Sequence, residues 1–591
     1  MRGSSLLALV RAPGTETYAL VDSADDVVAT SGAGRSSPAP SGDSPAEGSP
    51  AGDAPGPGRL RFAGDADALL PVLEELPRTA PATRLVWWDR SDLAPLAARG
   101  ARLRRGWDLQ EVHRLLVGGW SARADEVWAS AVGLPHDGLP AVPTGDLFDL
   151  APAADEGLVR ADGYLDPRLL TGELPRPDQL EAWGFLALHV CRRQAALLGE
   201  RGAQAVATAY SESGAAVLVT ELEQLGLGVD RPTLEGLITR FAGERPRSEA
   251  EALRLRRQRD AEVLRHVPGR EGTDLRNPAQ VLELLRGVGV LVDDTRSGRL
   301  EAHRHTHPVV GPLLEWRKAE RIATTYGWGW LDRHVGPDDR LRGSWTVCDG
   351  GAGRMTAGAG LHSLPAALRP GIAAPEGRVL LRADLGQVEP RVLAVVSRDV
   401  AFAEASRADD LYADVAGQLG VDRPTAKIAV LAAMYGQTSG PAGAALARME
   451  RTYPTAMRYL QTAARRGEQG QPVQTYGGRV VRVAHPTNGE QARATGRFTR
   501  NAVVQGAAAE LFKAWALTVR AALADHGSGT GRIVLMLHDE LLIELPERDA
   551  EGALDLVEQT LAAAGRRWSG GAPVRFVVDA KLVHRWSEAK D

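Results

Sequence analysis

The chain has 591 residues, a net charge of −5, 44% hydrophobic and 25% charged residues, a globular composition with room for several domains. Its only two cysteines, Cys191 and Cys348, exclude a disulfide framework and a cysteine-ligated zinc site. A protein that binds nucleic acid is often basic overall, so the acidic balance argues mildly against one. A local basic groove would still attract phosphate. The sequence has no apolar stretch of about 18 residues and no secretory signal, so we expect a cytoplasmic protein without membrane association.

The N-terminal third reads as an α/β domain interrupted by a low-complexity insertion. Residues 31–58 contain only Ser, Gly, Ala, Pro, Arg, Asp and Glu, which predicts a disordered loop. The apolar segments 18–21 and 60–62 flank this insertion and can pair as strands around it. Up to about residue 198, strand patterns such as 84–88 alternate with amphipathic helices, which is typical of an α/β domain.

The next segment, 211–333, is helical in pattern and heavily charged. Residues 249–265 mix acids and arginines at helical spacing, which favours a solvated helix surface. A helical arm lying along a nucleic-acid backbone is the alternative. From about residue 341 the pattern is mixed α and β, and this part carries the strong motifs.

Two aspartates follow apolar strand patterns. The β-type runs 532–537 and 541–545 flank a short acidic turn that contains Asp539, which predicts a hairpin. A third run, 379–383, leads directly to Asp384. Two acids at strand ends are what a two-metal phosphoryl-transfer site requires.

A predicted helix between these acids in sequence carries cations. Asp422 is a good N-cap, and Gly436 can end the helix after Tyr435. Residues at four-residue intervals drift only about 40° per step, so they form one shallow stripe: Arg423, Lys427, Leu431 and Tyr435. Two cations near the positive end of the helix dipole suit an anionic phosphate, although spacing alone also fits an ordinary surface helix.

A second stripe has the same spacing: Arg497, Asn501 and Gln505, just before an apolar helical pattern. These polar groups could be solvated, or they could hydrogen-bond a phosphate or a base edge.

These motifs together resemble the family A DNA polymerases, the bacterial DNA polymerase I type. Residues 381–393 resemble motif A of that family, 423–436 resemble motif B, and 537–540 resemble motif C. Shorter resemblances lie in family order around them: Asn277-Pro278-Ala-Gln280, Glu315-Trp-Arg-Lys318, Arg354, Pro365, Thr475-Tyr-Gly-Gly-Arg479 and 497–506. Each match alone is weak, but the ordered series is specific.

The resemblance implies an α+β right-hand polymerase of palm, fingers and thumb, preceded by an α/β RNase H-like domain. Its implied boundaries are a 3′–5′ exonuclease-like domain at 1–205, a thumb at 206–345, a palm at 346–404 and 501–591, and fingers at 405–500.

The resemblance also implies the site residues. Two Mg²⁺ ions would be held by Asp384, Asp539 and the backbone carbonyl of Leu385, with Glu540 in support, and Lys427 would act as general acid. The nucleotide would be bound by Arg423, Lys427, Leu431, Tyr435, Glu389 and Gln387. Within that set, Glu389 would exclude a ribose 2′-hydroxyl and Tyr435 would stack near the templating base. Primer and template would be contacted by Arg354, Arg497, Asn501, Gln505 and His538.

The chain departs from the family pattern near the nucleotide. Leu431 stands where an aromatic residue is usual, and Ala432 stands where Gly is usual. Pro390 replaces a common Leu in motif A, and an amide-rich run is replaced by Gly360, His362 and Ser363. These changes leave the expected metal site intact but predict weaker nucleotide binding.

The exonuclease-like domain lacks most of the carboxylates that its two-metal chemistry would need. An early strand should carry Asp-x-Glu, but Asp65-Ala-Asp67 follows Gly64 and reads as a turn. Asp92 resembles the acid of the second exonuclease segment, and residues 183–193 offer no acid for the last. We therefore expect this domain to be inactive.

We expect a monomeric DNA-directed DNA polymerase that adds deoxynucleoside triphosphates to the 3′-hydroxyl of a primer on template DNA. Three alternatives stay open: residual 3′–5′ exonuclease activity, a catalytically weak DNA-binding protein on a polymerase fold, and a single-subunit RNA polymerase. Glu389 argues against the last, because a small residue is needed there to admit a 2′-hydroxyl.

Overall fold

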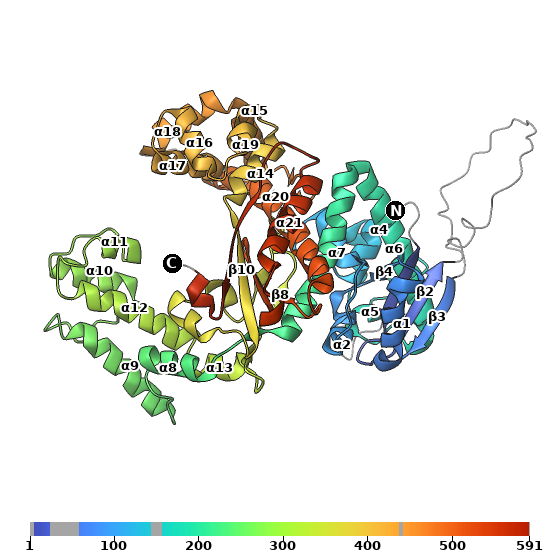
Figure 1. Ribbon diagram of the computed structural model, residues 1–591, viewed down its shortest axis with the longest axis horizontal. Helices are drawn as coiled ribbons and strands as arrows, with labels where there is room; N and C mark the ends of the chain where they lie inside the picture. Colours follow the sequence, from blue (N-terminus) through green and yellow to red (C-terminus); the bar gives the residue numbers. More distant parts are fainter. Residues whose placement is uncertain (1–4, 24–57, 143–156, 437–440, 590–591) are drawn as a thin grey trace, which may run out of the picture.

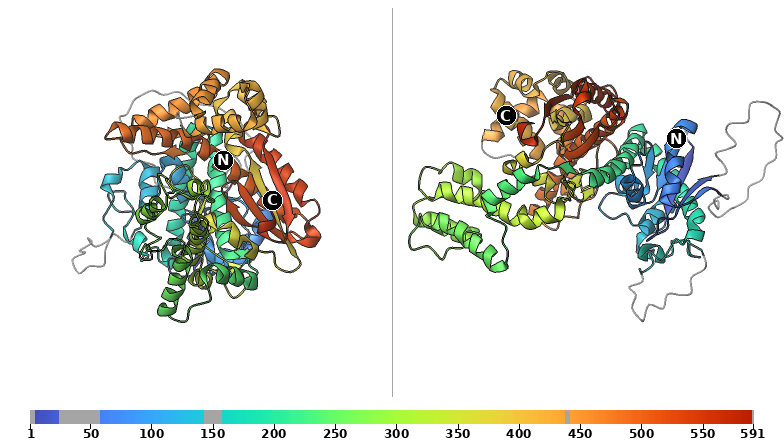
Figure 2. Two further views of the ribbon diagram at one scale, coloured as in Figure 1. Left: turned by 90° about the vertical axis from the view of Figure 1, so that its left-hand side faces the viewer. Right: turned by 60° about the horizontal axis from the view of Figure 1, so that its bottom comes forward.

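The computed structural model describes residues 5–23, 58–142, 157–436 and 441–589. Most of the predicted loop at 31–58 lies outside these residues, but Gly58 already begins a strand. Figure 1 shows the palm sheet around β10 in the middle, with a helical arm on one side, the finger helices above and an N-terminal domain on the other side. The right-hand view in Figure 2 likewise places the arm and the N-terminal domain on opposite sides of the palm.

The N-terminal domain is built on a mixed five-stranded sheet in the order β3-β2-β1-β4-β5. Its strands are β1 (Leu6–Arg11), β2 (Tyr18–Ser23), β3 (Gly58–Gly64), β4 (Arg84–Trp87) and β5 (Gly106–Asp108). The predicted pairing around the insertion is confirmed, because Leu20 on β2 lies opposite Phe62 on β3. Side chains of β1 alternate between two cores, so apolar helices cover both faces of the sheet. These are chiefly α6 (Leu180–Arg201) on one face and α1 (Ala66–Thr79) on the other.

Helix α7 (Ala203–Leu225) joins this domain to the rest of the chain. Its first turns pack in the N-terminal core through Ala205 and Ala209, and its later turns pack in the polymerase core through Val219 and Leu222. The expected boundary between residues 205 and 206 therefore falls inside one continuous helix. Sequence composition does not change at that point, since an apolar helix can serve two cores without interruption.

The helical arm has a core of its own. It contains α8 (Arg231–Ala242), α9 (Glu249–Leu264), α10 (Pro278–Gly287), α11 (Ser297–Glu301) and α12 (Val310–Thr325). In α9 only Val263 and Leu264 are buried, which confirms the solvated helix surface expected for residues 249–265.

The palm is a four-stranded antiparallel sheet in the order β13-β14-β10-β15. Its strands are β13 (Arg532–Leu537), β14 (Glu540–Pro546), β10 (Arg378–Gly386) and β15 (Val577–Val583). The predicted hairpin is confirmed as β13 and β14. Helix α21 (Ala553–Trp568) packs against β15 and β10.

The fingers consist of α15 (Val400–Ala405), α16 (Leu411–Leu419), α17 (Arg423–Tyr435), α18 (Pro441–Thr452) and α19 (Pro454–Glu468). Of these, α17 and α19 pack on α20 (Gly489–Asp525), a helix of 37 residues. The polar stripe at 497–505 and the apolar pattern after it thus belong to one helix, and the expected boundary at 500/501 lies within it. In the part of the chain that the structure describes, no helix is both long and apolar enough to cross a membrane.

Candidate active site

The two predicted catalytic acids lie on neighbouring strands of the palm. Asp384 is on β10, and Asp539 is in the turn between β13 and β14. The amide of Leu385 donates to the carbonyl of Asp539 at 3.0 Å, so the two backbones touch where the acids stand. Asp384 also lies opposite Glu540 on β14 and Asp579 on β15. The fold thus gathers four acidic residues at one end of the sheet.

A buried guanidinium stands among these acids. Arg382, which is 3% exposed, forms an ion pair with Asp384. It contacts Asp579 at 2.8 Å and Glu540 at 3.0 Å. Burial alone would lower the pKa of Arg382, but the neighbouring carboxylates of Glu540 and Asp384 raise it. Arg382 thereby offsets the repulsion that close carboxylates would otherwise exert on one another.

The donor set fits Mg²⁺, which prefers oxygen ligands and a few carboxylates completed by substrate phosphates. Glu540 is 6% exposed and accepts a hydrogen bond from Trp586 Nε1 at 2.7 Å in addition to its contact with Arg382. These contacts suit the supporting role expected of Glu540. Asp384 and Asp539 are each partly exposed, and among the residues that the structure describes no three or more Asp, Glu, His or Cys side chains form a ready-made metal site. Substrate phosphates would have to complete the coordination.

A cavity of about 760 Å³ opens beside Asp539. Eight of the predicted site residues line it: Arg354, Gln387, Glu389, Leu431, Tyr435, Gln505, His538 and Asp539. They come from the palm, the fingers and α20, and the fold brings them around one space large enough for a nucleotide. Further lining residues were not predicted from the sequence, among them Tyr412, Phe512 and Met536.

The helix predicted to carry Arg423 and Lys427 is confirmed as α17, which runs from Arg423 to Tyr435. The Asp422 side chain accepts from the amide of Thr425 at 2.9 Å, and Gly436 ends the helix with a φ of 68°. Arg423 and Lys427 are exposed, whereas Leu431 and Tyr435 line the cavity. The stripe therefore leads from the cavity to the outer surface of the fingers.

Asp410 connects Gln387 with Arg423. The amide nitrogen of Gln387 donates to Asp410 at 2.8 Å, and Arg423 Nε donates to the other carboxylate oxygen at 2.5 Å. Burial would raise the pKa of Asp410, but these hydrogen bonds hold it below its ordinary value. Gln387 itself has a left-handed backbone with a φ of 54°, an uncommon conformation that turns the chain from β10 into α14 (Val388–Ser397).

Glu389 and Tyr435 meet inside the cavity. The Tyr435 hydroxyl donates to Glu389 Oε2 at 3.1 Å. Burial raises the pKa of Glu389 above its ordinary value and raises that of Tyr435 to about 12. This hydrogen bond was not predicted from the sequence, although the two residues were expected at one site.

The residues expected to contact DNA are spread more widely. Arg354 is exposed and pairs with Asp349 at 3.3 Å. His538 is exposed in the β13–β14 turn, and its ring centroid lies 5.4 Å from that of His362. Of the α20 stripe, only Gln505 lines the cavity, whereas Asn501 is half-buried and Arg497 is exposed.

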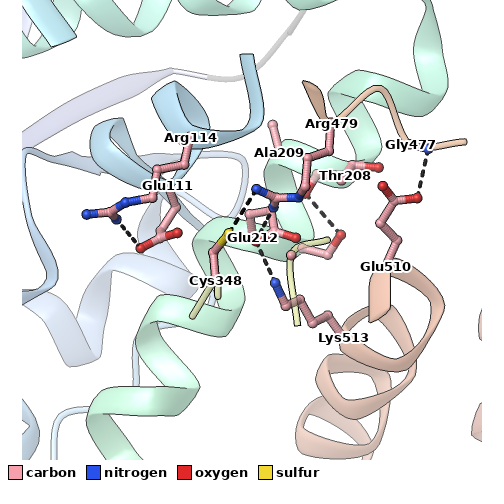
Figure 3. Close-up of polar contacts among 12 residues, drawn as sticks. Glu111, Arg114, Thr208, Ala209, Glu212, Cys348, Gly477, Arg479, Glu510 and Lys513 are labelled. Carbon is pink, nitrogen blue, oxygen red and sulfur yellow. Dashed lines mark hydrogen bonds and ion pairs between the residues drawn. The ribbon is translucent and has the colours of Figure 1, made fainter. Parts of the chain in front are cut away.

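A buried ionic network lies behind the cavity (Figure 3). Glu212 on α7 contacts Lys513 on α20 at 2.7 Å and Arg479 at 2.8 Å. Arg479 also donates to Cys348 Sγ at 3.2 Å. Glu510, one turn before Lys513, accepts from the amide of Gly477 at 2.7 Å, and burial raises its pKa to about 7. The segment 475–479, singled out in the sequence, thus joins α7 to α20.

Among its described residues, the N-terminal domain holds no group of three or more acids, histidines or cysteines that could bind a metal. Asp92 lies 3.7 Å from Arg11, so a cation stands at the end of β1 where acids were sought. Burial raises the pKa of Asp92 to about 8. The reading of Asp65-Ala-Asp67 as a turn was wrong, because Asp65 caps α1 and Asp67 lies in its first turn. An Asp N-cap explains the pattern equally well.

The family model for DNA polymerase family A matches residues 289–588 of this chain, about half of its length. The chain therefore belongs to the family A DNA polymerases. It is 28% identical to DNA polymerase I of Pseudomonas aeruginosa over 310 residues, which cover 47% of this chain and 33% of that protein. It is 28% identical to the thermostable DNA polymerase I of Thermus filiformis over 411 residues, 63% of this chain and 47% of that protein. The chain thus spans between a third and a half of the length of these two relatives.

A longer alignment joins the chain to the thermostable DNA polymerase I of Thermus aquaticus, with 25% identity over 578 residues, 88% of this chain and 65% of that protein. Among solved structures, the chain is similar to the POL domain of Pol1 from M. smegmatis in complex with DNA primer-template and dNTP. The TM-score is 0.66 at 19% identity, and the match covers 100% of this chain and 97% of that one. This likeness shows a shared polymerase fold.

Proposed function

We propose that this protein is a template-directed DNA polymerase that adds deoxynucleoside triphosphates to a primer 3′-hydroxyl by two-metal nucleotidyl transfer. The observation that carries the proposal is the backbone contact between Leu385 and Asp539, which brings the Asp384 end of β10 next to Asp539. Of these two acids, Asp539 lines the nucleotide-sized cavity. The family assignment supports the same chemistry.

Asp384, Asp539 and the carbonyl of Leu385 would hold the two Mg²⁺ ions. When bound, these ions would supply Lewis-acid stabilisation to the attacking and leaving oxygens. The chain's own part is to present these oxygens on two adjacent strands. Until the ions bind, the ion pair with Arg382 neutralises the Asp384 carboxylate.

Arg423 and Lys427 would bind the triphosphate. Both are exposed in the first two turns of α17, where the helix dipole also favours an anion. Arg423 would exchange Asp410 for a phosphate oxygen, and Lys427 would donate a proton to the leaving pyrophosphate. Within the cavity, Glu389 would exclude the 2′-hydroxyl of a ribonucleotide, while Leu431 and Tyr435 would contact the nucleoside.

The DNA would lie along the cavity mouth. Arg354, Arg497, Asn501, Gln505 and His538 would bind the primer and the template, chiefly at phosphates and in the minor groove. We propose that the chain is divided into thumb, palm and fingers as the sequence implied. The two boundaries that fell inside α7 and α20 would lie at the ends of these helices instead. We also propose that the protein works as a monomer in the cytoplasm, as a polymerase of bacterial type.

We propose further that the N-terminal domain has no exonuclease activity. The sequence supports this, because Asp92 is the one acid found of the set expected there, and a single carboxylate does not suffice for two-metal chemistry. Asp92 also lies 3.7 Å from Arg11. The second candidate function, a DNA-binding protein with weak catalysis, is favoured by one observation only: Leu431 gives the nucleoside side of the cavity no aromatic face.

A primer-extension assay tests the proposal. Wild type with Mg²⁺ should extend a primer with deoxynucleotides, and Asp539→Ala should lose at least about 1,000-fold in rate because half of the carboxylate set is gone. The matched control is Asp555→Ala, an exposed acid on α21 that should leave the rate unchanged. Equal rates for wild type and Asp539→Ala would favour the DNA-binding alternative.

A further inference from the structure

A second cavity, of about 440 Å³, lies between the N-terminal domain and the polymerase part of the chain. It is bounded by the loop before β5, by α7 and by the last third of α20. None of its lining residues also lines the active-site cavity. It is therefore a separate space, to which neither the palm acids nor α17 contributes.

Positive charge dominates this second cavity. Five arginines line it: Arg84, Arg102, Arg104, Arg105 and Arg520. Arg520 is neutralised by Glu221, with Nε at 2.8 Å from the carboxylate. The other four have no carboxylate within 4.0 Å among the residues that the structure describes. The lining contains one acid, Asp525, which is exposed at the rim.

Arg84 is the most enclosed of the five. One of its terminal nitrogens donates to the Gly106 carbonyl at 2.9 Å, and its guanidinium carbon lies 3.8 Å from the centre of the Tyr210 ring. Its Nε is buried and has no hydrogen-bond partner within the described part of the chain.

The arginines also act on one another. Burial lowers the pKa of Arg84, and the nearby charge of Arg105 lowers it further. Burial likewise lowers the pKa of Arg102; the charge of Glu221 opposes this effect, and those of Arg520 and Arg104 add to it. The cavity thus gathers five arginines against two nearby acids, Glu221 and Asp525, an excess of positive charge that a bound anion would stabilise.

Part of the cavity wall is apolar, formed by Leu103, Val217, Leu517 and Ala521. A volume of about 440 Å³ lies in the range of small-molecule sites. Guanidinium groups bind phosphates through paired hydrogen bonds, and an apolar wall accepts a ring. We propose that this cavity binds a nucleoside di- or triphosphate, with the phosphates on Arg84, Arg104 and Arg105 and the nucleoside against the apolar wall.

The test uses ADP and pyrophosphate as probes without divalent metal, in isothermal titration calorimetry. The background is Arg423→Ala/Lys427→Ala, which removes the cations proposed to hold the substrate triphosphate. ADP should still bind to this background at one site per chain. Adding Arg104→Ala/Arg105→Ala should weaken ADP binding at least about 10-fold, since two phosphate contacts are lost. The charge-matched control Arg78→Ala/Arg286→Ala, at two exposed positions that do not line the cavity, should bind ADP as the background does.

A second variant guards against a folding defect in the double mutant. Ala521→Asp places a carboxylate at an exposed position of the apolar wall and should also weaken ADP binding at least about 10-fold by like-charge repulsion. Pyrophosphate should bind more weakly than ADP, because it leaves that wall uncovered. The proposal is overturned if ADP does not bind at about 1 mM, or if it binds equally to the background and to both variants. Equal affinities for ADP and pyrophosphate would overturn the nucleoside part.

Discussion

Tyr435, the last residue of α17, donates its hydroxyl hydrogen to Glu389 on α14 at 3.1 Å. The residue proposed to exclude ribonucleotides is thus held in place by the helix proposed to carry the triphosphate. One hydrogen bond connects the choice of sugar to the position of the fingers.

Replacement of Glu389 should relax the choice of sugar. In Glu389→Ala the space beside the nucleotide opens, and discrimination against ribonucleotides should fall by about 10-fold or more. Tyr435→Phe keeps the ring but frees Glu389, so a smaller loss of about 2- to 5-fold is expected from one hydrogen bond. Single-nucleotide incorporation with dATP and ATP measures the ratio, and unchanged discrimination in Glu389→Ala would contradict the proposed role.

An aromatic ring at position 431 should improve nucleotide binding. Leu431 lines the cavity, and Leu431→Phe would restore a ring face worth about 0.5–1.5 kcal/mol, or roughly 2- to 10-fold in the KM for the nucleotide. Steady-state primer extension gives this KM. The control is Ile428→Phe on the exposed side of the same helix, which should behave as wild type. A KM that does not fall in Leu431→Phe refutes the prediction.

Removal of Arg382 should destabilise the palm in the absence of metal. Arg382→Met leaves Asp384, Glu540 and Asp579 without their shared cation, and loss of one partner of a buried ion pair costs about 3 kcal/mol. Urea unfolding in EDTA measures the free energy of unfolding. Mn²⁺ should recover part of the loss in the variant and have a smaller effect on wild type. A variant as stable as wild type in EDTA would show that the acids need no counter-ion.

Glu510 should make the stability of the protein depend on pH. Its folded pKa of about 7 lies above the ordinary value of 4.5, so the folded state binds the proton more tightly than the unfolded state. Its contribution is therefore fully present below about pH 4.5 and is lost as the pH rises to about 7 and above, amounting to about 3 kcal/mol. Glu510→Gln keeps the shape and can still accept from Gly477.

The measurement is the free energy of unfolding between pH 5 and 8. Wild type should lose more stability over this range than Glu510→Gln, while the exposed control Glu558→Gln should follow wild type. Parallel curves for wild type and Glu510→Gln would show that any pH dependence of the free energy of unfolding comes from the titration of other groups.

The N-terminal domain should not remove a mismatched primer end. With Mg²⁺, wild type and Asp92→Ala should degrade a mismatched 3′ terminus equally slowly, at the rate of a sample without enzyme. The reason is that Asp92 is the one acid found of the expected set, and a single carboxylate does not suffice for two-metal chemistry. Degradation by wild type that Asp92→Ala abolishes would restore the exonuclease alternative.

Much of the palm and fingers could be predicted from local patterns. The hairpin around Asp539 and the helix from Arg423 to Tyr435 are set by short-range signals: alternating apolar residues, an Asp cap and a terminal Gly. Such signals act within a few residues, and the sequence shows them directly. The grouping of eight predicted residues around one cavity followed from the family resemblance rather than from spacing.

The contacts that depend on distant segments could not be predicted. Arg382 meets Glu540 and Asp579 only because β10 lies between β14 and β15, and no local pattern records that order. Tyr412 reaches the cavity because Asp410 caps α16 and also binds Gln387. Gln387 lies 23 positions from Asp410 in the sequence, so no local pattern indicates this contact.

Because α7 buries side chains in both the N-terminal core and the polymerase core, neither part can melt without stripping apolar surface from the other. Heating should therefore give one cooperative calorimetric transition rather than two. A proteolytic nick within that helix would disorder both halves at once, so the N-terminal domain contributes to the stability of the polymerase part whatever its own chemistry.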